Sequence, residues 1–344
     1  MPKTSANAHP VVVVTGAGAG IGRAIALRFA KDGARLGLIS RDRAALDGAA
    51  EEVKRAGAQE ARIAAIDVSE AGAVAAAADR FEDELGPIDL WVNDAMVTVF
   101  APLDEMSPEE FRRVTEVTYL GSVHGTMAAL KHMRARNRGH IVNVGSALAY
   151  RGIPLQSAYC GAKHAIRGFT AALRSELEHD NSRIALSIVE MPATNTPQFD
   201  WARTHMPKRP KPMGTIYQPE AAAEAVHRAY LTRRHEYWVG LSTFLTIVGN
   251  MVAPSFMDWY LARSAVRGQE TEQSVRSDRR DNLFEPVTEL HRTHGHFDAA
   301  AKRHAMTIPG QPTRAAVVGA GAVLFLALGA VVSLLSAGTG VRRA

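Results

Sequence analysis

The chain has 344 residues, of which 47% are hydrophobic and 22% charged, so it can bury a full-sized core in one large domain or two smaller ones. Its single cysteine, Cys160, excludes an internal disulfide and suits a reducing compartment. Residues 1–10 contain no long apolar segment, so we expect no signal peptide. From Trp201 onward, 18 Lys and Arg residues stand against 11 Asp and Glu, a surplus typical of a solvated face, an anionic membrane surface or a nucleic-acid site.

The N-terminal part combines a strand, a glycine-rich loop and a helix. Val11–Val14 is a β-branched run, Thr15–Gly22 contains four glycines, and an amphipathic helix follows to about Asp32. Glycines in such a turn let backbone N–H groups approach a pyrophosphate, and the helix N-terminus adds a partial positive charge. A glycine motif alone also fits a tight turn, but here its context predicts a dinucleotide site.

The residues after the second predicted strand bear on the type of dinucleotide. This strand spans 35–40 and is followed by Arg41, Asp42 and Arg43. Ser40 and Arg41 offer a hydroxyl and a cation to a ribose 2′-phosphate, which favours NADP. Asp42 is the argument for NAD, because a carboxylate accepts from ribose hydroxyls and repels that phosphate.

Strands and helices alternate up to about residue 240. Helices are predicted at 43–56, 71–85, 107–136, 158–180 and after Pro219, and strands at 61–66, 90–93, 141–146, 185–189 and 237–239. Every crossover is helical, so we expect an α/β fold with a Rossmann-type, doubly wound parallel sheet and helices on both faces.

Tyr159 and Lys163 stand four residues apart in the predicted helix 158–180 and therefore share a face. A nearby ammonium favours the phenolate and lowers the pKa of a phenol, so the pair can carry proton chemistry. Ser146 ends a buried strand, and its hydroxyl is placed to hold a substrate oxygen beside the phenol. Such a Tyr–Lys pair is common by itself, and most such pairs are a half-buried Tyr beside a surface Lys.

Taken together, these motifs resemble those of the short-chain dehydrogenase/reductase family over roughly residues 11–240. The resemblance implies that Tyr159 donates or accepts the proton, and that Lys163 lowers its pKa and binds the nicotinamide ribose. It implies that Ser146 holds the carbonyl or carbinol oxygen. The cofactor-binding residues that it implies are Thr15, Gly16, Gly20, Ile21, Gly22, Ser40, Arg41, Asp67, Val68, Asn93, Ala95, Tyr159, Lys163, Pro192, Thr194 and Thr196.

The chain departs from the family pattern in two places. Asp94 and Met96 stand where the family usually has Asn and Gly, which puts an extra acid and a bulkier side chain near the nicotinamide. Thr118 stands where the family has its fourth catalytic residue, an Asn that places a water for the lysine. A Thr hydroxyl can still hold a water, so Thr118 is retained as a catalytic candidate.

Three segments follow the last predicted strands of the core. Residues 195–213 correspond to the mobile substrate loop of the resemblance and are expected to cover the pocket. Residues 241–257 carry no charge and fit either a packed helix or an interfacial helix that admits apolar substrates. The four histidines within 291–304 lack a Cys or a tight carboxylate set, so no metal site is expected.

Residues 315–338 are 24 residues without a charge, followed by Arg342 and Arg343. At about 1.5 Å per residue they exceed the hydrocarbon core of roughly 30 Å, which predicts a transmembrane helix. The alternative is a buried or oligomerisation helix. The predicted organisation is a flexible N-terminus (1–9), a Rossmann catalytic domain (10–240), a C-terminal extension (241–314) and the membrane helix (315–338).

The sequence thus predicts an NADP-dependent oxidoreductase that transfers a hydride between nicotinamide and a carbonyl or alcohol substrate, with a lipophilic ketone, steroid-like or long-chain compound favoured. We expect a cytoplasmic catalytic domain on a single-pass C-terminal anchor that contacts membrane lipid, with homo-oligomer formation left open. The alternative is a non-catalytic, NADP-binding sensor or scaffold. A sugar-nucleotide epimerase is disfavoured by the glycine spacing, and no nucleic-acid-binding module is found.

Overall fold

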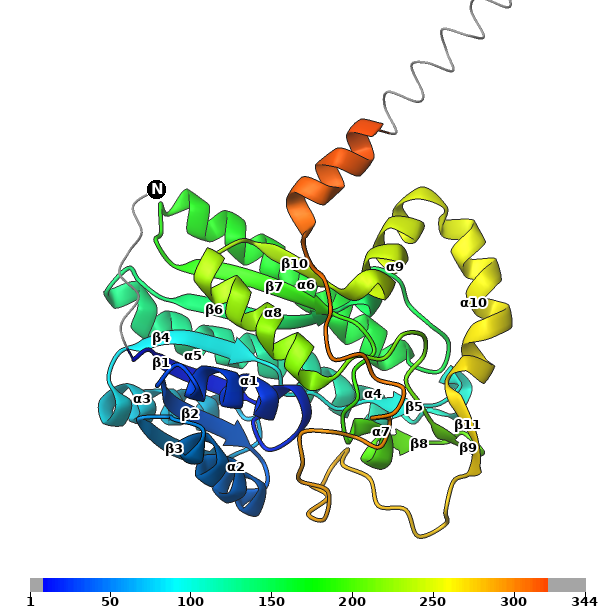
Figure 1. The fold of residues 1–344 in the computed structure, drawn as a ribbon, viewed down its shortest axis with the longest axis horizontal. Coiled ribbons are helices and arrows are strands. Elements are labelled where there is room, and N and C mark those ends of the chain that lie inside the picture. The colour runs from blue at the N-terminus through cyan, green and yellow to red at the C-terminus, as the bar shows by residue number, and fades with distance from the viewer. Residues whose placement is uncertain (1–8, 321–344) are drawn as a thin grey trace, which may run out of the picture.

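The computed structural model describes residues 9–320 and is built around one eight-stranded sheet (Figure 1). The strand order is β12-β10-β7-β6-β4-β1-β2-β3. These strands are β1 (Val11–Thr15), β2 (Arg35–Ser40), β3 (Glu60–Ala65), β4 (Ile88–Asn93), β6 (His140–Ser146), β7 (Ala185–Met191), β10 (Glu236–Val239) and β12 (Thr307–Pro309).

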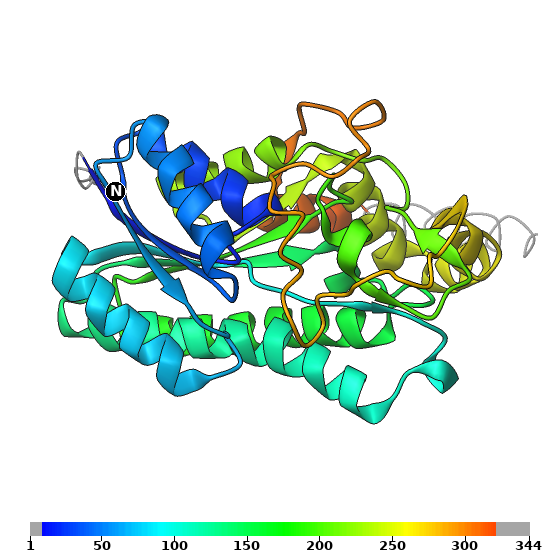
Figure 2. The same ribbon diagram turned by 90° about the horizontal axis from the view of Figure 1, so that it is seen from below.

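Helices cover both faces of the sheet, as Figure 2 shows in side view. On one face lie α1 (Gly20–Ala30), α2 (Arg43–Arg55) and α8 (Pro219–Thr232). On the other lie α3 (Ala71–Leu85), α4 (Pro108–Val114), α5 (Gly121–Ala135) and α6 (Ser157–His179). The doubly wound α/β prediction is confirmed for this layered core.

The sheet is buried on both faces because its central strands are apolar at consecutive positions. Val11, Val12, Val13 and Val14 are all fully buried, and alternate members belong to the two hydrophobic clusters on opposite faces. Such continuous apolar runs are typical of parallel strands sandwiched between helices.

The strand order reverses direction between β1 and β4, which pair in parallel. In open α/β sheets a ligand binds in the crevice at the carboxyl ends of the strands beside such a reversal. The loops that follow Thr15 and Asn93 lie at these ends, so the fold places the glycine-rich loop at the expected crevice.

The single helix predicted over 107–136 is interrupted. It begins at a capping box, in which the Ser107 hydroxyl accepts from the Glu110 N–H while the Glu110 carboxylate accepts from the Ser107 N–H. Between α4 and α5 the chain then forms a π-helical turn, η2 (Thr115–Leu120). Thr118 lies in this turn, and such turns are frequent at functional sites.

The all-parallel sheet prediction is wrong at one edge. Strand β12, from the C-terminal extension, pairs antiparallel with β10, matching Trp238 with Ile308. At three residues it is too short to give a period-two signal, so the sequence pattern could not show it.

The uncharged stretch 241–257 forms α9 (Gly240–Val252) and the first turn of α10 (Pro254–Gly268), and the two helices make a hairpin. Pro254 ends the first helix and begins the second, because a proline is accepted at the first turn of a helix but not inside it. Several large apolar side chains of the hairpin are exposed, among them Val252 at 69%, Phe256 at 57% and Trp259 at 52%.

Shorter elements complete the substrate side. They are β5 (Val99–Phe100), η1 (Leu103–Glu105), η3 (Ala147–Ala149), α7 (Gln198–Trp201), β8 (Arg203–Thr204), β9 (Lys208–Pro210) and β11 (Glu270–Ser274). Strand β9 pairs antiparallel with β11, which ties the predicted substrate loop 195–213 to the end of α10.

Within residues 9–320 no helix is both long and apolar enough to cross a bilayer. Residues 310–320 are helical and include the start of the predicted transmembrane helix. The remainder of that prediction, residues 321–338, lies outside the described residues.

Candidate active site

Two adjacent cavities lie at the carboxyl ends of the strands. The first, of about 200 Å³, is lined by the glycine-rich loop, the end of β2 and the loops after β3 and β4. The second, of about 590 Å³, is lined by the ends of β6 and β7, by α6 and by the α9–α10 hairpin. The two share Ile21, Asp94, Met96, Thr196 and Gln198, so one bound molecule can reach from one cavity into the other.

The glycine-rich loop forms a tight cradle. Gly16 and Gly20 have φ angles of +76° and +55°, which L side chains rarely adopt. A Cβ at Gly22 would lie 2.4 Å from the Gly16 carbonyl oxygen, so the first helical turn packs directly against the loop. The chemistry of this cradle, which presents backbone N–H groups at a helix N-terminus, fits a dinucleotide pyrophosphate.

The loop after β4 is fastened to the cradle. The Thr15 hydroxyl accepts from the Asp94 N–H at 3.0 Å and from the Ala95 N–H at 3.1 Å. The Asn93 side chain is buried; its Nδ2 donates to Asn143 Oδ1 at 2.8 Å, and its Oδ1 accepts from Trp91. In this structure Asn93 holds the strands together, and Ala95 lines the first cavity.

Ser146, Tyr159 and Lys163, which the sequence separates by up to 17 positions, all line the second cavity. The Lys163 ammonium donates to the Val144 carbonyl oxygen at 2.7 Å and lies 5.6 Å from the centre of the Tyr159 ring. The Ser146 hydroxyl accepts from the Leu148 N–H at 3.1 Å. The structure therefore brings three of the four predicted catalytic residues together at one cavity.

Burial dominates the ionisation of this cluster. It raises the pKa of Tyr159, while a hydrogen bond with Ser146 opposes the shift. The phenol pKa is thus not lowered in this structure, contrary to the expectation from the Tyr–Lys pair. Burial also lowers the pKa of Lys163 to about 8, against the attraction of Asp94 and Glu190.

Two carboxyl groups at the site were not among the predicted site residues. Asp94 lines both cavities, and burial raises its pKa to about 7 against the attraction of Lys163. Glu190 is fully buried under Ser146, whose N–H donates to Glu190 Oε2 at 2.6 Å; burial and the charge of Glu236 raise its pKa to about 8. A charged residue within the apolar run 188–191 was the signal available in the sequence.

Thr118 is fully buried and tied to the loop after β4. Its hydroxyl donates to the Val97 carbonyl oxygen at 2.9 Å and accepts from the Val97 N–H at 3.1 Å. These bonds use its only proton, so in this structure Thr118 connects η2 to that loop. One lone pair of the Thr118 hydroxyl oxygen remains, so a relay water could bind to Thr118 only by donating a hydrogen bond to it.

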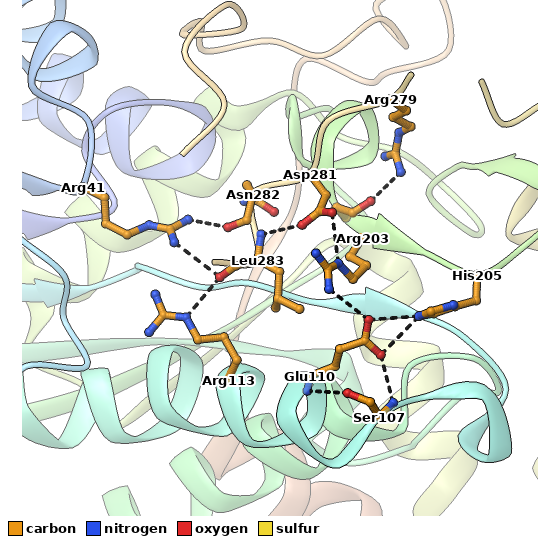
Figure 3. Close-up of polar contacts among 11 residues, drawn as sticks. Arg41, Ser107, Glu110, Arg113, Arg203, His205, Arg279, Asp281, Asn282 and Leu283 are labelled. Carbon is orange, nitrogen blue, oxygen red and sulfur yellow. Dashed lines mark hydrogen bonds and ion pairs between the residues drawn. The ribbon is translucent and has the colours of Figure 1, made fainter. Parts of the chain in front are cut away.

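The predicted adenosine-side residues Ser40, Arg41, Asp67 and Val68 all line the first cavity. The Arg41 guanidinium donates to the backbone carbonyl oxygens of Asn282 and Leu283 in the C-terminal extension (Figure 3). It also donates to the Phe284 carbonyl oxygen at 2.8 Å. Burial acts to raise the pKa of the Asp67 carboxyl, but hydrogen bonds from Arg113 and Ser69 outweigh burial and hold that pKa below its usual value. Both charged groups therefore have protein partners already.

The segment after β7 forms the wall between the cavities. Pro192 and Thr194 line the second cavity, and Thr196 lines both. The Thr194 hydroxyl donates to the Pro192 carbonyl oxygen at 3.1 Å, which fixes a turn. The loop 195–213 continues from this wall, and its Lys211 and Met213 line the second cavity.

No cluster of three metal-ligating side chains occurs within residues 9–320. His291, His294 and His296 instead form separate contacts with Asp42, Glu220 and Asp200.

Comparison with known proteins decides the family, because residues 10–206 match the family described as short chain dehydrogenase. The chain belongs to the short-chain dehydrogenase family. This short-chain dehydrogenase is 28% identical to an uncharacterized oxidoreductase, YxnA, of Bacillus subtilis over 304 residues, 85% of each chain. It is 31% identical to estradiol 17-beta-dehydrogenase 11 of Mus musculus over 258 residues, 74% of this chain and 84% of that one.

Among solved structures, it resembles a metagenomic short-chain oxidoreductase crystallised in complex with NADP. The TM-score is 0.55 at 28% identity, and the match covers 65% of this short-chain dehydrogenase and 93% of the other chain. These relatives support its assignment as an oxidoreductase with a Rossmann-like fold.

Proposed function

We propose that this short-chain dehydrogenase uses NADP to interconvert a lipophilic carbonyl compound and its alcohol. The observation that carries the proposal is the second cavity, which Ser146 and Tyr159 line together with apolar side chains of the α9–α10 hairpin. The NADP-bound structural relative and the cation Arg41 beside the first cavity support the choice of cofactor.

The bound nicotinamide would supply or accept the hydride at its C4 carbon. Ser146 would hold the substrate oxygen, and Tyr159 would deliver the proton to that oxygen during reduction. Lys163 would hold the nicotinamide ribose, and its positive charge would favour loss of the Tyr159 proton. The burial of Tyr159 opposes this effect, because it raises the pKa of the phenol. Pro192, Thr194 and Thr196 would flank the nicotinamide amide.

The walls of the second cavity support the substrate class. Leu241, Leu245, Phe256 and Tyr260 of the α9–α10 hairpin line it, and each is also partly exposed at the surface. A cavity lined mainly by apolar side chains, with a few polar groups that fix the orientation of the ligand, is the usual form of a small-molecule site. The related estradiol dehydrogenase acts, by its name, on a steroid.

We propose that the protein meets a membrane on the side of this hairpin, with the catalytic domain in the cytoplasm. Support comes from the exposed Val252, Phe256 and Trp259 and from the helix at 310–320, which projects toward the same side (Figure 1). Aromatic side chains are favoured at the membrane interface, and the uncharged residues 315–338 are long enough for an anchor.

The activity is tested by NADPH oxidation with a panel of steroid ketones, long-chain ketones and short water-soluble ketones, run with Tyr159→Phe as the control. We expect turnover with apolar ketones by the wild type only. Turnover restricted to the short ketones would overturn the lipophilic substrate class, and equal turnover by both proteins would overturn the catalytic assignment.

The membrane placement is tested separately by deleting residues 315–344 and fractionating cells that express either form. We expect full-length protein in the membrane fraction and a soluble, folded truncated form. Full-length protein in the soluble fraction would contradict the proposal, as would aggregation of the truncated form.

A further inference from the structure

A segment of the C-terminal extension, residues 278–298, crosses the first cavity; we call it the strap. It follows β11, contains no helix or strand, and leads toward β12. Figures 1 and 2 show it passing across the end of the sheet from the α10 side toward α1. Asn282, Pro286, Val287 and His291 of the strap form one wall of the cavity that the glycine-rich loop forms on the other side.

One anchor of the strap lies at Leu283. Its side chain is fully buried in the hydrophobic cluster below the sheet, whereas that of its neighbour Phe284 is 43% exposed. Two guanidinium groups donate to backbone carbonyl oxygens here: Arg41 to those of Asn282 and Leu283, and Arg113 to that of Leu283 at 3.1 Å (Figure 3). Arg41 also donates to the Phe284 carbonyl oxygen. The strap thus occupies Arg41 with neutral acceptors.

A second anchor joins the strap to the predicted substrate loop. Asp281 forms an ion pair with Arg203 at 3.0 Å, and the Asn282 N–H donates to the Trp201 carbonyl oxygen at 2.9 Å. Arg279 donates to the carbonyl oxygens of Phe199 and Ala202 as well. Movement of the strap would therefore be transmitted to the segment that lines the second cavity.

The far end of the strap lies on the phosphate cradle itself. The Gly20 N–H, at the N-terminus of α1, donates to the Arg292 carbonyl oxygen at 3.1 Å. Arg23 donates to the His291 carbonyl oxygen at 3.2 Å, and the His291 ring contacts the Asp42 carboxylate at 3.3 Å. The Gly20 N–H, which a helix N-terminus would otherwise offer to a phosphate, is therefore bonded to the strap.

The remaining space is small. The first cavity has about 200 Å³, below the roughly 300–1,000 Å³ of ordinary ligand pockets. With the strap in this position, the adenosine and phosphate groups of a dinucleotide would compete with strap atoms for the cradle and for Arg41.

We propose that the strap is a gate over the cofactor site, which the dinucleotide must displace at residues 282–292 to bind. The inference rests on the proposed use of NADP. On displacement, the Arg41 guanidinium passes from backbone carbonyl oxygens to the 2′-phosphate. Charge-assisted hydrogen bonds to an anion are stronger than those to neutral carbonyls, so NADP opens the gate more readily than NAD, which lacks that phosphate.

The test is stopped-flow binding of NADPH and NADH to the full-length protein, followed by nucleotide fluorescence. For the wild type, the observed rate should reach a plateau at high nucleotide concentration, because displacement of the strap then limits binding. The plateau should be higher with NADPH than with NADH, because the 2′-phosphate assists displacement, and equal plateaus would contradict the role of Arg41. Leu283→Ala, which removes the buried anchor, should raise the plateau and the NADPH dissociation rate by about tenfold or more. Thr288→Ala, at an exposed position of the strap, is the control and should leave both unchanged.

Asp281→Asn weakens the ion pair of the second anchor without removing a buried apolar side chain. It should therefore raise the plateau rate and the NADPH dissociation rate by a smaller factor than Leu283→Ala. Rates that rise linearly with NADPH concentration and are the same in the wild type, Leu283→Ala and Asp281→Asn would overturn the gate while leaving NADP binding intact. No binding of NADPH to any of these proteins would overturn the proposed cofactor and the gate together.

Discussion

Replacing Glu190 by Gln should stabilise the fold, and increasingly so as pH rises. Glu190 is fully buried, and its Oε1 has no hydrogen-bond partner within the part of the chain that the structure describes. Burial and the charge of Glu236 raise its pKa from 4.5 to about 8. A Gln keeps an oxygen for the Ser146 N–H and cannot ionise.

The magnitude follows from the two pKa values. The folded protein holds the Glu190 proton more tightly than the unfolded chain, so rising pH favours unfolding between about 4.5 and about 8. At about 1.36 kcal/mol per pH unit, the wild type loses on the order of 3 kcal/mol from this group between pH 5 and pH 7. The Gln variant should not show this loss.

The assay is urea unfolding of both proteins at pH 5 and pH 7, with the free energy of unfolding obtained by linear extrapolation. The free energy of unfolding of the variant minus that of the wild type should grow by about 3 kcal/mol from pH 5 to pH 7. Glu51→Gln, at an exposed position of α2, serves as the control and should show no such growth. A difference that stays constant, or that reverses in favour of the wild type at pH 7, would show that Glu190 is ionised in the fold and refute the reasoning.

Three further substitutions test single residues. Tyr159→Phe should lower turnover by roughly 100- to 10,000-fold while the NADPH dissociation constant, measured by titration calorimetry, stays the same; a comparable turnover would remove Tyr159 from the proton step. Arg41→Asp should weaken NADPH binding far more than NADH binding, and equal losses for the two cofactors would exclude a contact with the 2′-phosphate. Thr118→Val should lower the free energy of unfolding by on the order of 1–3 kcal/mol because it leaves Val97 polar groups unpaired, whereas Thr118→Ser should not; the idea fails if both variants unfold like the wild type.

The core of the fold could be predicted from local patterns. Val11–Val14 is apolar at every position and Ile141–Val144 at every position but Asn143, which identifies buried parallel strands. Helical spacing identified α3 with its observed bounds. The long predicted helix missed η2, because a π-helical turn adds one residue without breaking the amphipathic pattern. Strand β12 was missed because three residues carry no period.

The candidate site was predictable only where a motif marks it. Ser146, Tyr159 and Lys163 stand at recognised spacings, and the fold gathers them at one cavity. The strap contacts were not predictable, since most of them run through backbone carbonyl oxygens of an irregular segment far away in sequence. The raised pKa values of Asp94 and Glu190 depend on burial, which no single-residue pattern reveals.

The central claim, hydride transfer to a carbonyl carbon at the Tyr159 site, is tested most directly with NADPH in which both hydrogens at C4 are replaced by deuterium. The account predicts that wild-type protein, supplied with an apolar ketone, forms an alcohol with one deuterium on the carbinol carbon, as seen by mass spectrometry, and that Tyr159→Phe forms almost none. Oxidation of NADPH without deuterium in an alcohol product would contradict the account.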